Sequence, residues 1–300
     1  NNHKIHIQYL YTYNSLRMNI NSICVCGAGT MGNGIAQAAA QTGFSVILYE
    51  LNTAVLAKAK EATGENLQML VDKEKISADE REKITRRIHY TNDIQTCLAD
   101  VFIEAIVEKA EIKIALFNQL AELNHSECIF ATNTSSLSVT AIAEKIQRPE
   151  RVIGMHFFNP ATIMKLVEVV NTPHTNEITT NTIMELAKQM GKMPVLCKDA
   201  PGFIVNRVAR SFYTETMRLV EEGHVSVEVA DNLLEASGFK MGPFKLMDLI
   251  GNDVNYAVSC SVYEQMNKNE RFKPSYIQEQ KVKEGKLGKK SGEGFYKYSP

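Results

Sequence analysis

A glycine-rich turn near the start of the sequence constrains the fold most strongly. Residues 23–26 form a short apolar run that predicts a buried strand, and the small residues after the turn predict a helix. In such a strand–turn–helix the first glycine permits a sharp bend, the second lets backbone approach a pyrophosphate, and the third lets helix and strand pack closely. The turn therefore predicts a dinucleotide site, with a ligand-free glycine turn as the alternative. Its residues are Gly27, Ala28, Gly29, Thr30, Met31 and Gly32.

An acidic residue at the end of the next predicted strand, residues 45–49, indicates which dinucleotide binds. Glu50 stands where a carboxylate can accept hydrogen bonds from an adenosine ribose. Its charge would repel a 2′-phosphate. We therefore expect NAD as the cofactor rather than NADP, with a solvated strand-end glutamate as the alternative.

Strand-like and helix-like patterns alternate over the first two thirds of the chain. This alternation predicts an α/β domain with a Rossmann-type, doubly wound parallel sheet over residues 18–200. The further predicted strands cover residues 100–106 and 128–132, and the predicted helices cover residues 32–42, 53 to about 73, 109–123 and 139–145.

The pattern changes after a breaker cluster, Asp199-Ala-Pro-Gly202. Beyond it the apolar spacing is helical, so we expect an all-helical substrate and dimerisation domain over residues 201–300. Amphipathic helices with surplus apolar surface commonly pack against a second subunit, which predicts a homodimer or a dimer of dimers. The predicted helices cover residues 203–222, 227–237 and 253–266.

Residues 1–17 differ from the rest of the chain, because they contain no acidic residue and no small-residue cleavage pattern. Met18 then opens the ordered pattern. We expect residues 1–17 to be a non-native or disordered leader, either vector-derived or translated from upstream. An organelle-targeting leader is the alternative.

Charge and cysteine content limit the partners that the chain can have. The 33 basic and 34 acidic side chains give a net charge of −1, so we expect neither nucleic acid nor a membrane as a partner. The six cysteines lack the paired spacing of a zinc site, and we predict no metal. Free thiols are typical of a reducing compartment, so we expect a soluble, cytoplasmic protein.

Two extended segments, residues 154–160 and 165–170, read as neighbouring strands of a hairpin. The first contains His156 and the second Glu168. If residues 159–164 form the loop and Phe158 faces Lys165, His156 faces Val167 and Glu168 lies one residue off. Diagonal neighbours in a sheet are still within reach of one another.

Such a pair suits the oxidation of an alcohol, which needs a base for the hydroxyl proton as well as a hydride acceptor. Histidine titrates near neutrality, and a carboxylate on its second nitrogen fixes the tautomer and stabilises the imidazolium. The alternative is a hydrogen-bonded core histidine and an unrelated surface glutamate.

Six segments together carry a resemblance to a known family: GAGTMGNGIAQ from residue 27, EAIVE from 104, TNTSSLSVT from 132, GMHFFNPATIMKLVEVV from 154, KDAPGFIVNRV from 198 and GKKSGEGFYKY from 288. Over residues 18–298 the chain resembles the L-3-hydroxyacyl-CoA dehydrogenase family, most closely its short bacterial 3-hydroxybutyryl-CoA members. The resemblance implies NAD-dependent interconversion of (S)-3-hydroxyacyl-CoA and 3-oxoacyl-CoA thioesters, with a four-carbon acyl chain, in butyrate or fatty-acid metabolism.

The resemblance also implies roles for individual residues. His156 would be the general base or acid and Glu168 its partner. Ser135 and Asn206 would hydrogen-bond the reacting oxygen or the thioester carbonyl. The plainer interpretation of Ser135 is that it belongs to a polar helix cap.

Further positions match the cofactor and substrate contacts of the family. Asn159 would help to hold nicotinamide and substrate, and Ser135 would contact both. Glu108, Lys113 and Lys290 would contact the cofactor, and Lys73 would meet coenzyme A phosphate, unless it belongs to a solvated helix face. Glu50 departs from the aspartate of many relatives, although its longer side chain should still serve the ribose.

Two alternatives stay open at this point. A dehydrogenase of the 3-hydroxyisobutyrate or 6-phosphogluconate type would rely on a lysine base, whereas this chain has His156 and Glu168 in the matching segment. A non-catalytic NAD-binding protein would keep the fold without turnover. Turnover measured beside NAD binding separates the two classes.

Overall fold

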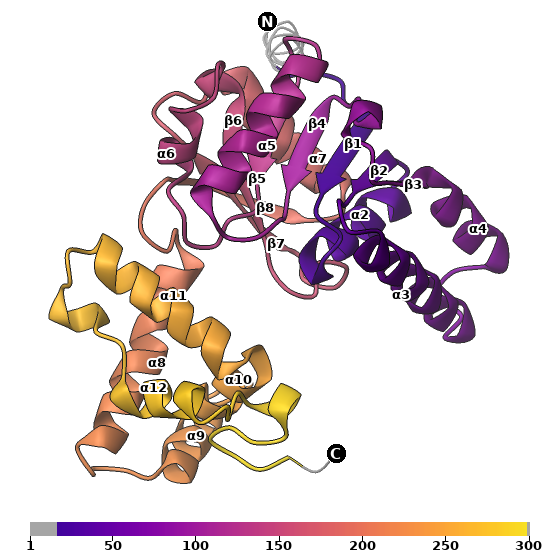
Figure 1. Cartoon of the computed structure of the whole chain (residues 1–300). Coiled ribbons are helices and arrows are strands. Elements are labelled where there is room, and N and C mark those ends of the chain that lie inside the picture. Colours follow the sequence, from indigo (N-terminus) through magenta and orange to yellow (C-terminus); the bar gives the residue numbers. More distant parts are fainter. Residues whose placement is uncertain (1–16, 299–300) are drawn as a thin grey trace, which may run out of the picture. The chain divides into compact units, whose positions relative to one another are not determined.

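A computed structural model describes residues 17–298 of the 300-residue chain (Figure 1). The predicted leader, residues 1–17, lies outside the described residues except for Arg17. The chain forms two compact units that divide between Asp199 and Ala200, whereas the sequence places the boundary between residues 200 and 201. No helix among the described residues is both long enough and apolar enough to cross a membrane.

The first unit is built on one sheet with the strand order β3-β2-β1-β4-β5-β6-β7-β8. Neighbouring strands from β3 to β6 are parallel, β6 and β7 are antiparallel, and β7 and β8 are parallel. The predicted Rossmann-type sheet is therefore confirmed. The strands are β1 (Ser22–Cys26), β2 (Ser45–Tyr49), β3 (Ile88–Thr91), β4 (Val101–Glu104), β5 (Ile129–Thr132), β6 (Val152–Phe157), β7 (Leu166–Asn171) and β8 (Met193–Lys198).

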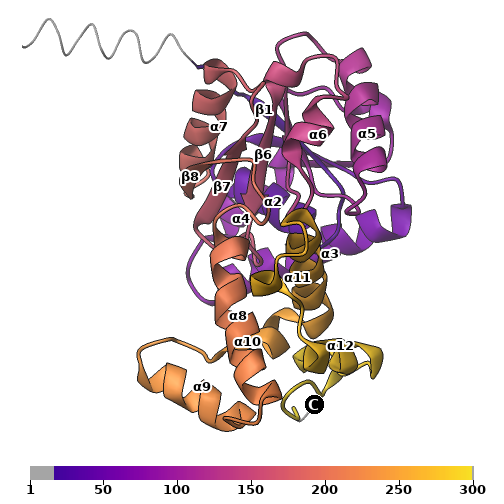
Figure 2. The ribbon, with the colours of Figure 1, turned by 90° about the vertical axis from the view of Figure 1, so that its left-hand side faces the viewer.

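Helices cover both faces of this sheet, with α7 on one side and α5 and α6 on the other (Figure 2). The winding direction reverses between β3 and β4, which creates a topological switch point beside β1, where α/β proteins bind ligands. The helices are α2 (Thr30–Gln41), α3 (Thr53–Asp72), α4 (Ala78–Arg87), α5 (Ala110–Leu123), α6 (Val139–Ala143) and α7 (Glu177–Gln189), with short 3-10 turns η1 (Ile94–Thr96) and η2 (Pro149–Arg151).

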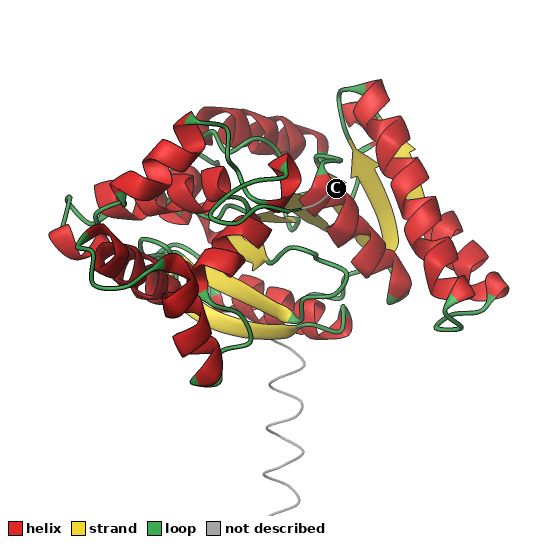
Figure 3. Ribbon diagram, turned by 90° about the horizontal axis from the view of Figure 1, so that it is seen from below, coloured by secondary structure: helices red, strands yellow, loops and turns green. Residues whose placement is uncertain are grey.

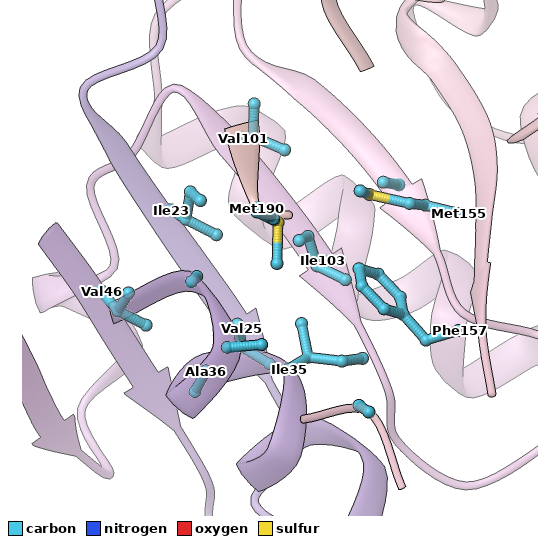
Figure 4. Packing of buried hydrophobic residues seen from close by; sticks show 14 of the residues in the cluster. Ile23, Val25, Ile35, Ala36, Val46, Val101, Ile103, Met155, Phe157 and Met190 are labelled. Atoms are coloured by element: carbon cyan, nitrogen blue, oxygen red, sulfur yellow. The ribbon is translucent and has the colours of Figure 1, made fainter. Parts of the chain in front are cut away.

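The main apolar core fixes which face of the sheet each strand residue occupies. Ile23 and Val25 of β1 lie in it with Met155 and Phe157 of β6 (Figure 4). Because successive side chains of a strand point to opposite faces, His156 must project from the other face. The burial of its two neighbours therefore orients this histidine toward the side of α5 and α6.

The second unit contains helices, and among its described residues only isolated β-bridges (Figure 3). The predicted all-helical domain is confirmed. Tyr213, Met217, Phe244 and Met247 form its core. The helices are α8 (Val205–Glu221), α9 (Val227–Ala236), α10 (Pro243–Ile250), α11 (Asn252–Gln265) and α12 (Tyr276–Lys283), with 3-10 turns η3 (Glu270–Phe272) and η4 (Lys289–Ser291).

Candidate active site

The glycine-rich turn lies at the carboxyl end of β1, beside the switch point. A Cβ added to Gly32 would lie 1.8 Å from the carbonyl oxygen of Gly27, and Gly27 itself has φ +98°. A Cβ added to Gly29 would meet no heavy atom within 4 Å. The first and third glycines therefore serve the fold, whereas the second leaves an open stretch of backbone.

The same turn presents the start of α2. Gly29 is the N-cap, and Thr30 and Met31 are the first two helical residues, with no side-chain cap within the described part of the chain. Uncapped N–H groups and the positive end of the helix dipole attract an anion. The turn therefore fits a pyrophosphate group.

Glu50 lies beside this turn and is hydrogen-bonded to its backbone. Its Oε2 accepts a hydrogen bond from the backbone N–H of Ala28 at 3.1 Å, and its Oε1 accepts one from Asn52 at 3.0 Å. These bonds hold a carboxylate against the glycine turn, at the end of β2. A negative charge in this position disfavours a phosphorylated ribose, so the geometry agrees with NAD.

We expect Gly29→Ala to weaken NADH binding with little effect on stability. The φ of Gly29 is −66°, which alanine adopts without strain, but the new methyl group would occupy the open backbone surface. The NADH Kd should rise roughly tenfold or more, equivalent to about 1.4 kcal/mol. Fluorescence titration with NADH and urea unfolding measure the two effects.

The matched control is Gly64→Ala in α3, where an added Cβ also meets nothing within 4 Å. This change should leave the NADH Kd unaltered. An unchanged Kd in Gly29→Ala would contradict the proposed place of the pyrophosphate.

A cluster of two carboxylates and one ammonium lies at the carboxyl end of β4. Lys113 Nζ is 2.6 Å from Glu104 Oε1 and 3.1 Å from Glu108 Oε2, and the side chains of Lys113 and Glu104 are 1% and 0% exposed. Burial raises the pKa of Glu104, although Lys113 opposes the rise. Burial alone would also raise the pKa of Glu108, but Lys113 and several hydrogen bonds outweigh it and lower that pKa.

Glu108 organises the turn that follows β5. Its Oε1 accepts hydrogen bonds from the backbone N–H groups of Ser135 at 3.0 Å and Ser136 at 3.3 Å, and from the hydroxyl of Thr134. The structure thus joins Glu108, Lys113 and Ser135, which the sequence analysis treats as separate ligand contacts. Lys113 is held between carboxylates within this network.

Sequence reasoning missed Glu104, which also accepts hydrogen bonds from the Thr132 hydroxyl at 2.7 Å and the Ile106 N–H at 2.8 Å. A signal was present, because a charged residue closes an otherwise apolar strand. Its partner Lys113 stands on the following helix, and only the packing of that helix shows the pairing.

His156 on β6 and Glu168 on β7 face each other directly. The antiparallel ladder pairs His156 with Glu168 and Phe157 with Val167. The predicted register, with His156 opposite Val167, is therefore wrong by one residue. The reason is the innermost ladder pair, which is Phe157 with Val167 rather than Phe158 with Lys165. The chain between the paired residues, residues 158–166, therefore has an odd number of residues, whereas the predicted loop, residues 159–164, has an even number.

The pair is short and buried. Imidazole Nδ1 lies 2.7 Å from Glu168 Oε2, and the two residues are 5% and 1% exposed. A carboxylate at this distance from Nδ1 fixes the orientation of the imidazole ring. The ring of Phe158 packs against the imidazole, with centroids 4.6 Å apart.

A glycine brings α6 close to the histidine. A Cβ on Gly154 would lie 2.7 Å from Val170 Cβ and 3.1 Å from Val139 Cγ2, the first residue of α6. Gly154 and His156 project from the same face of β6, because they are two residues apart. The absence of a side chain therefore lets α6 and the turn before it approach the face that carries the imidazole.

The remaining predicted residues have the following surroundings. Asn159 lies exposed in the loop after β6, and Lys73 lies exposed at the C-terminal end of α3. Asn206 and Lys290 belong to the second unit. There the Asn206 carbonyl accepts a hydrogen bond from Arg210 Nε at 3.1 Å, and Lys290 Nζ lies 2.6 Å from Asp253.

A Rossmann-type sheet with a glycine turn, together with a buried imidazole–carboxylate pair, is the architecture of a nicotinamide-dependent dehydrogenase. The comparison with known families is more specific. The chain belongs to the 3-hydroxyacyl-CoA dehydrogenase family, since the model of its NAD binding domain matches residues 22–200 and that of its C-terminal domain matches residues 202–298. The predicted family is thus confirmed, the protein is an NAD-dependent enzyme of this family, and NAD is its cofactor.

Individual relatives agree with this assignment. The 3-hydroxyadipyl-CoA dehydrogenase of Escherichia coli (strain K12) is 46% identical over 283 residues, which cover 94% of this chain and 60% of that protein. The mitochondrial hydroxyacyl-coenzyme A dehydrogenase of Sus scrofa is 40% identical over 287 residues, 93% of this chain and 91% of the relative. The chain therefore spans about three fifths of the first relative and most of the second.

The fold also matches solved structures over most of its length. The (S)-3-hydroxybutyryl-CoA dehydrogenase from Ralstonia eutropha has a TM-score of 0.90 and 34% identity, with 94% of this chain and all of that chain covered.

Proposed function

We propose that this protein interconverts (S)-3-hydroxybutyryl-CoA and acetoacetyl-CoA, with His156 as the general base or acid and Glu168 as its partner. The observation that carries the proposal is the 2.7 Å contact between these two buried side chains, in the same unit as the glycine turn. When bound at that turn, NAD supplies the acceptor or donor of the hydride. The proton that accompanies it must be handled by the chain.

In this proposal the imidazole removes the hydroxyl proton during oxidation and returns it during reduction. Because Glu168 holds Nδ1 of the imidazole, the proton moves at the other ring nitrogen, Nε2. Ser135 and Asn206 hydrogen-bond the reacting oxygen or the thioester carbonyl, which polarises it as charge develops.

The remaining ligand assignments come from the family resemblance. Glu50 would hold the adenosine ribose, Asn159 would help to hold the nicotinamide and the substrate, and Glu108 and Ser135 would contact the cofactor. Lys113, which is held between two carboxylates, would also contact the cofactor. Lys290 would contact the cofactor and Lys73 a phosphate of coenzyme A.

The length of the substrate's acyl chain is the most specific part of the proposed function. Two of the relatives carry the names of 3-hydroxyadipyl-CoA and 3-hydroxybutyryl-CoA dehydrogenases. The resemblance to the short bacterial members favours the four-carbon chain, and a place in butyrate or fatty-acid metabolism. Relative kcat/KM values for acetoacetyl-CoA and longer 3-oxoacyl-CoA thioesters measure this preference.

We also propose a homodimer, or a dimer of dimers, formed through the second unit in the cytoplasm. Large apolar side chains are exposed on α8 and α9, among them Val208 at 70%, Val229 at 56% and Leu233 at 64%. Such side chains favour burial against a second copy. The six cysteines form no disulfide, as is usual in a reducing compartment.

The function is tested by following NADH consumption with acetoacetyl-CoA, with free acetoacetate, and with NADPH in place of NADH. Rapid consumption with NADH and the thioester alone would support the reaction, the cofactor and the need for coenzyme A together. No consumption by protein that binds NADH would instead support a non-catalytic NAD-binding protein.

A further inference from the structure

We propose that Asn133 is a positioning residue, which fixes the end of β6 that carries His156 relative to the turn that carries Ser135. The inference rests on the proposed function of His156. It adds a residue to which neither the family resemblance nor the proposed chemistry assigns a role.

The strands β5 and β6 part before they reach the site. Their last ladder pair joins Thr132 to Gly154, so β5 contributes no strand partner to the two residues of β6 nearest the site, His156 and Phe157. On the opposite side, β7 pairs with both of them. The end of β6 is therefore held by the ladder on one side only.

Asn133 supplies the missing contact on the other side. Its side-chain Oδ1 accepts a hydrogen bond from the backbone N–H of Phe157 at 2.8 Å, and its own backbone N–H donates to the carbonyl of Glu104 at 2.8 Å. One residue thus connects the ends of β4, β5 and β6. The amide oxygen takes the place of a strand carbonyl and satisfies a donor beside the buried histidine.

This contact lies between the two parts of the site that must cooperate. Asn133 immediately precedes the turn at Thr134, Ser135 and Ser136, whose backbone Glu108 holds. A proton-transfer group and the groups that bind the reacting oxygen need a mutual position fixed to within about 0.5 Å. Loss of the Asn133 contact would loosen His156 relative to Ser135 without altering the glycine turn.

Three variants test the proposal. Asn133→Ala removes the acceptor, and Asn133→Asp keeps an oxygen in the same place. Asn124→Ala is the matched control, because the Asn124 Oδ1 also accepts a backbone N–H, that of Ala99 at 3.2 Å, just before the amino end of β4. Hydrogen exchange at Phe157 in the unliganded protein, the NADH Kd, and kcat and KM for acetoacetyl-CoA are measured for each variant.

In Asn133→Ala we expect exchange at Phe157 to become roughly tenfold faster or more, because its N–H loses its partner. The kcat should fall roughly tenfold or more while the NADH Kd changes by less than about twofold, since geometry and not cofactor binding is lost. Asn133→Asp should retain protection and recover most of kcat. Asn124→Ala should change neither quantity.

Unchanged exchange at Phe157 in Asn133→Ala, or an equal loss of kcat in the alanine and aspartate variants, would overturn the proposal. If Asn133→Ala does not fold, Asn133→Asp carries the test, because fast exchange or a low kcat in that variant would also overturn it. Absent turnover in the unmodified protein, together with faster exchange in Asn133→Ala, would refute the proposed function and still confirm that Asn133 holds β6.

Discussion

His156→Ala is expected to lower the kcat for acetoacetyl-CoA reduction by about 10²-fold or more, the usual contribution of a positioned acid or base. NADH binding should be nearly unchanged, because the glycine turn and Glu50 follow β1 and β2, whereas His156 lies on β6. Steady-state kinetics and NADH fluorescence titration measure the two quantities on the same protein sample.

The matched control is His174→Ala. His174 also pairs with a glutamate, at 3.5 Å from Glu144, but its side chain is 39% exposed. This change should leave kcat unaltered. Near-normal turnover in His156→Ala would remove the buried pair from the mechanism.

Lys113→Met is expected to lower the free energy of unfolding by about 3–5 kcal/mol, because it leaves buried charge without its partner. Glu104 is fully buried and would lose the cation 2.6 Å away, and Glu108 would lose its only ion-pair partner among the described residues. Urea unfolding measures the loss. Lys188→Met is the control, since Lys188 is 52% exposed and 3.8 Å from Glu185, and its removal should cost less than about 1 kcal/mol.

The pH dependence of this loss has a definite sign. The pKa of Glu104 is already raised by burial, and without Lys113 it should rise further. A carboxyl whose folded pKa exceeds its unfolded value weakens the fold only where it is ionised, so the penalty disappears below the unfolded pKa. The deficit of Lys113→Met should therefore shrink as the pH falls from neutrality. A deficit independent of pH would show that lost packing causes it.

The sequence predicts the elements whose apolar residues recur with a clear period, and misses those that lack one. The helix α4 buries only Ile84, and β8 is an edge strand whose side chains are mostly exposed or half-buried, so neither shows an apolar face. In α7 buried threonines interrupt the apolar stripe. These elements gain their stability from packing on the sheet, which a local pattern does not contain.

The residues of the candidate site also divide into those that the sequence predicts and those that it misses. His156 and Glu168 are predictable as a pair because a short hairpin joins them, but the register depends on where each strand ends. Phe158 is apolar, so the sequence predicts that it belongs to the strand, but in the structure it lies in the loop. The contacts of Glu104 and Asn133 join separate strands and helices, so they become visible only when the sheet is assembled.

The proposed reaction transfers hydride between NADH and the third carbon of an acyl-CoA thioester. The most direct test supplies NADH deuterated at the transferable position together with acetoacetyl-CoA, and analyses the thioester by mass spectrometry. We predict (S)-3-hydroxybutyryl-CoA with one deuterium on its third carbon. Unchanged acetoacetyl-CoA, from protein shown to bind NADH, would contradict the claim.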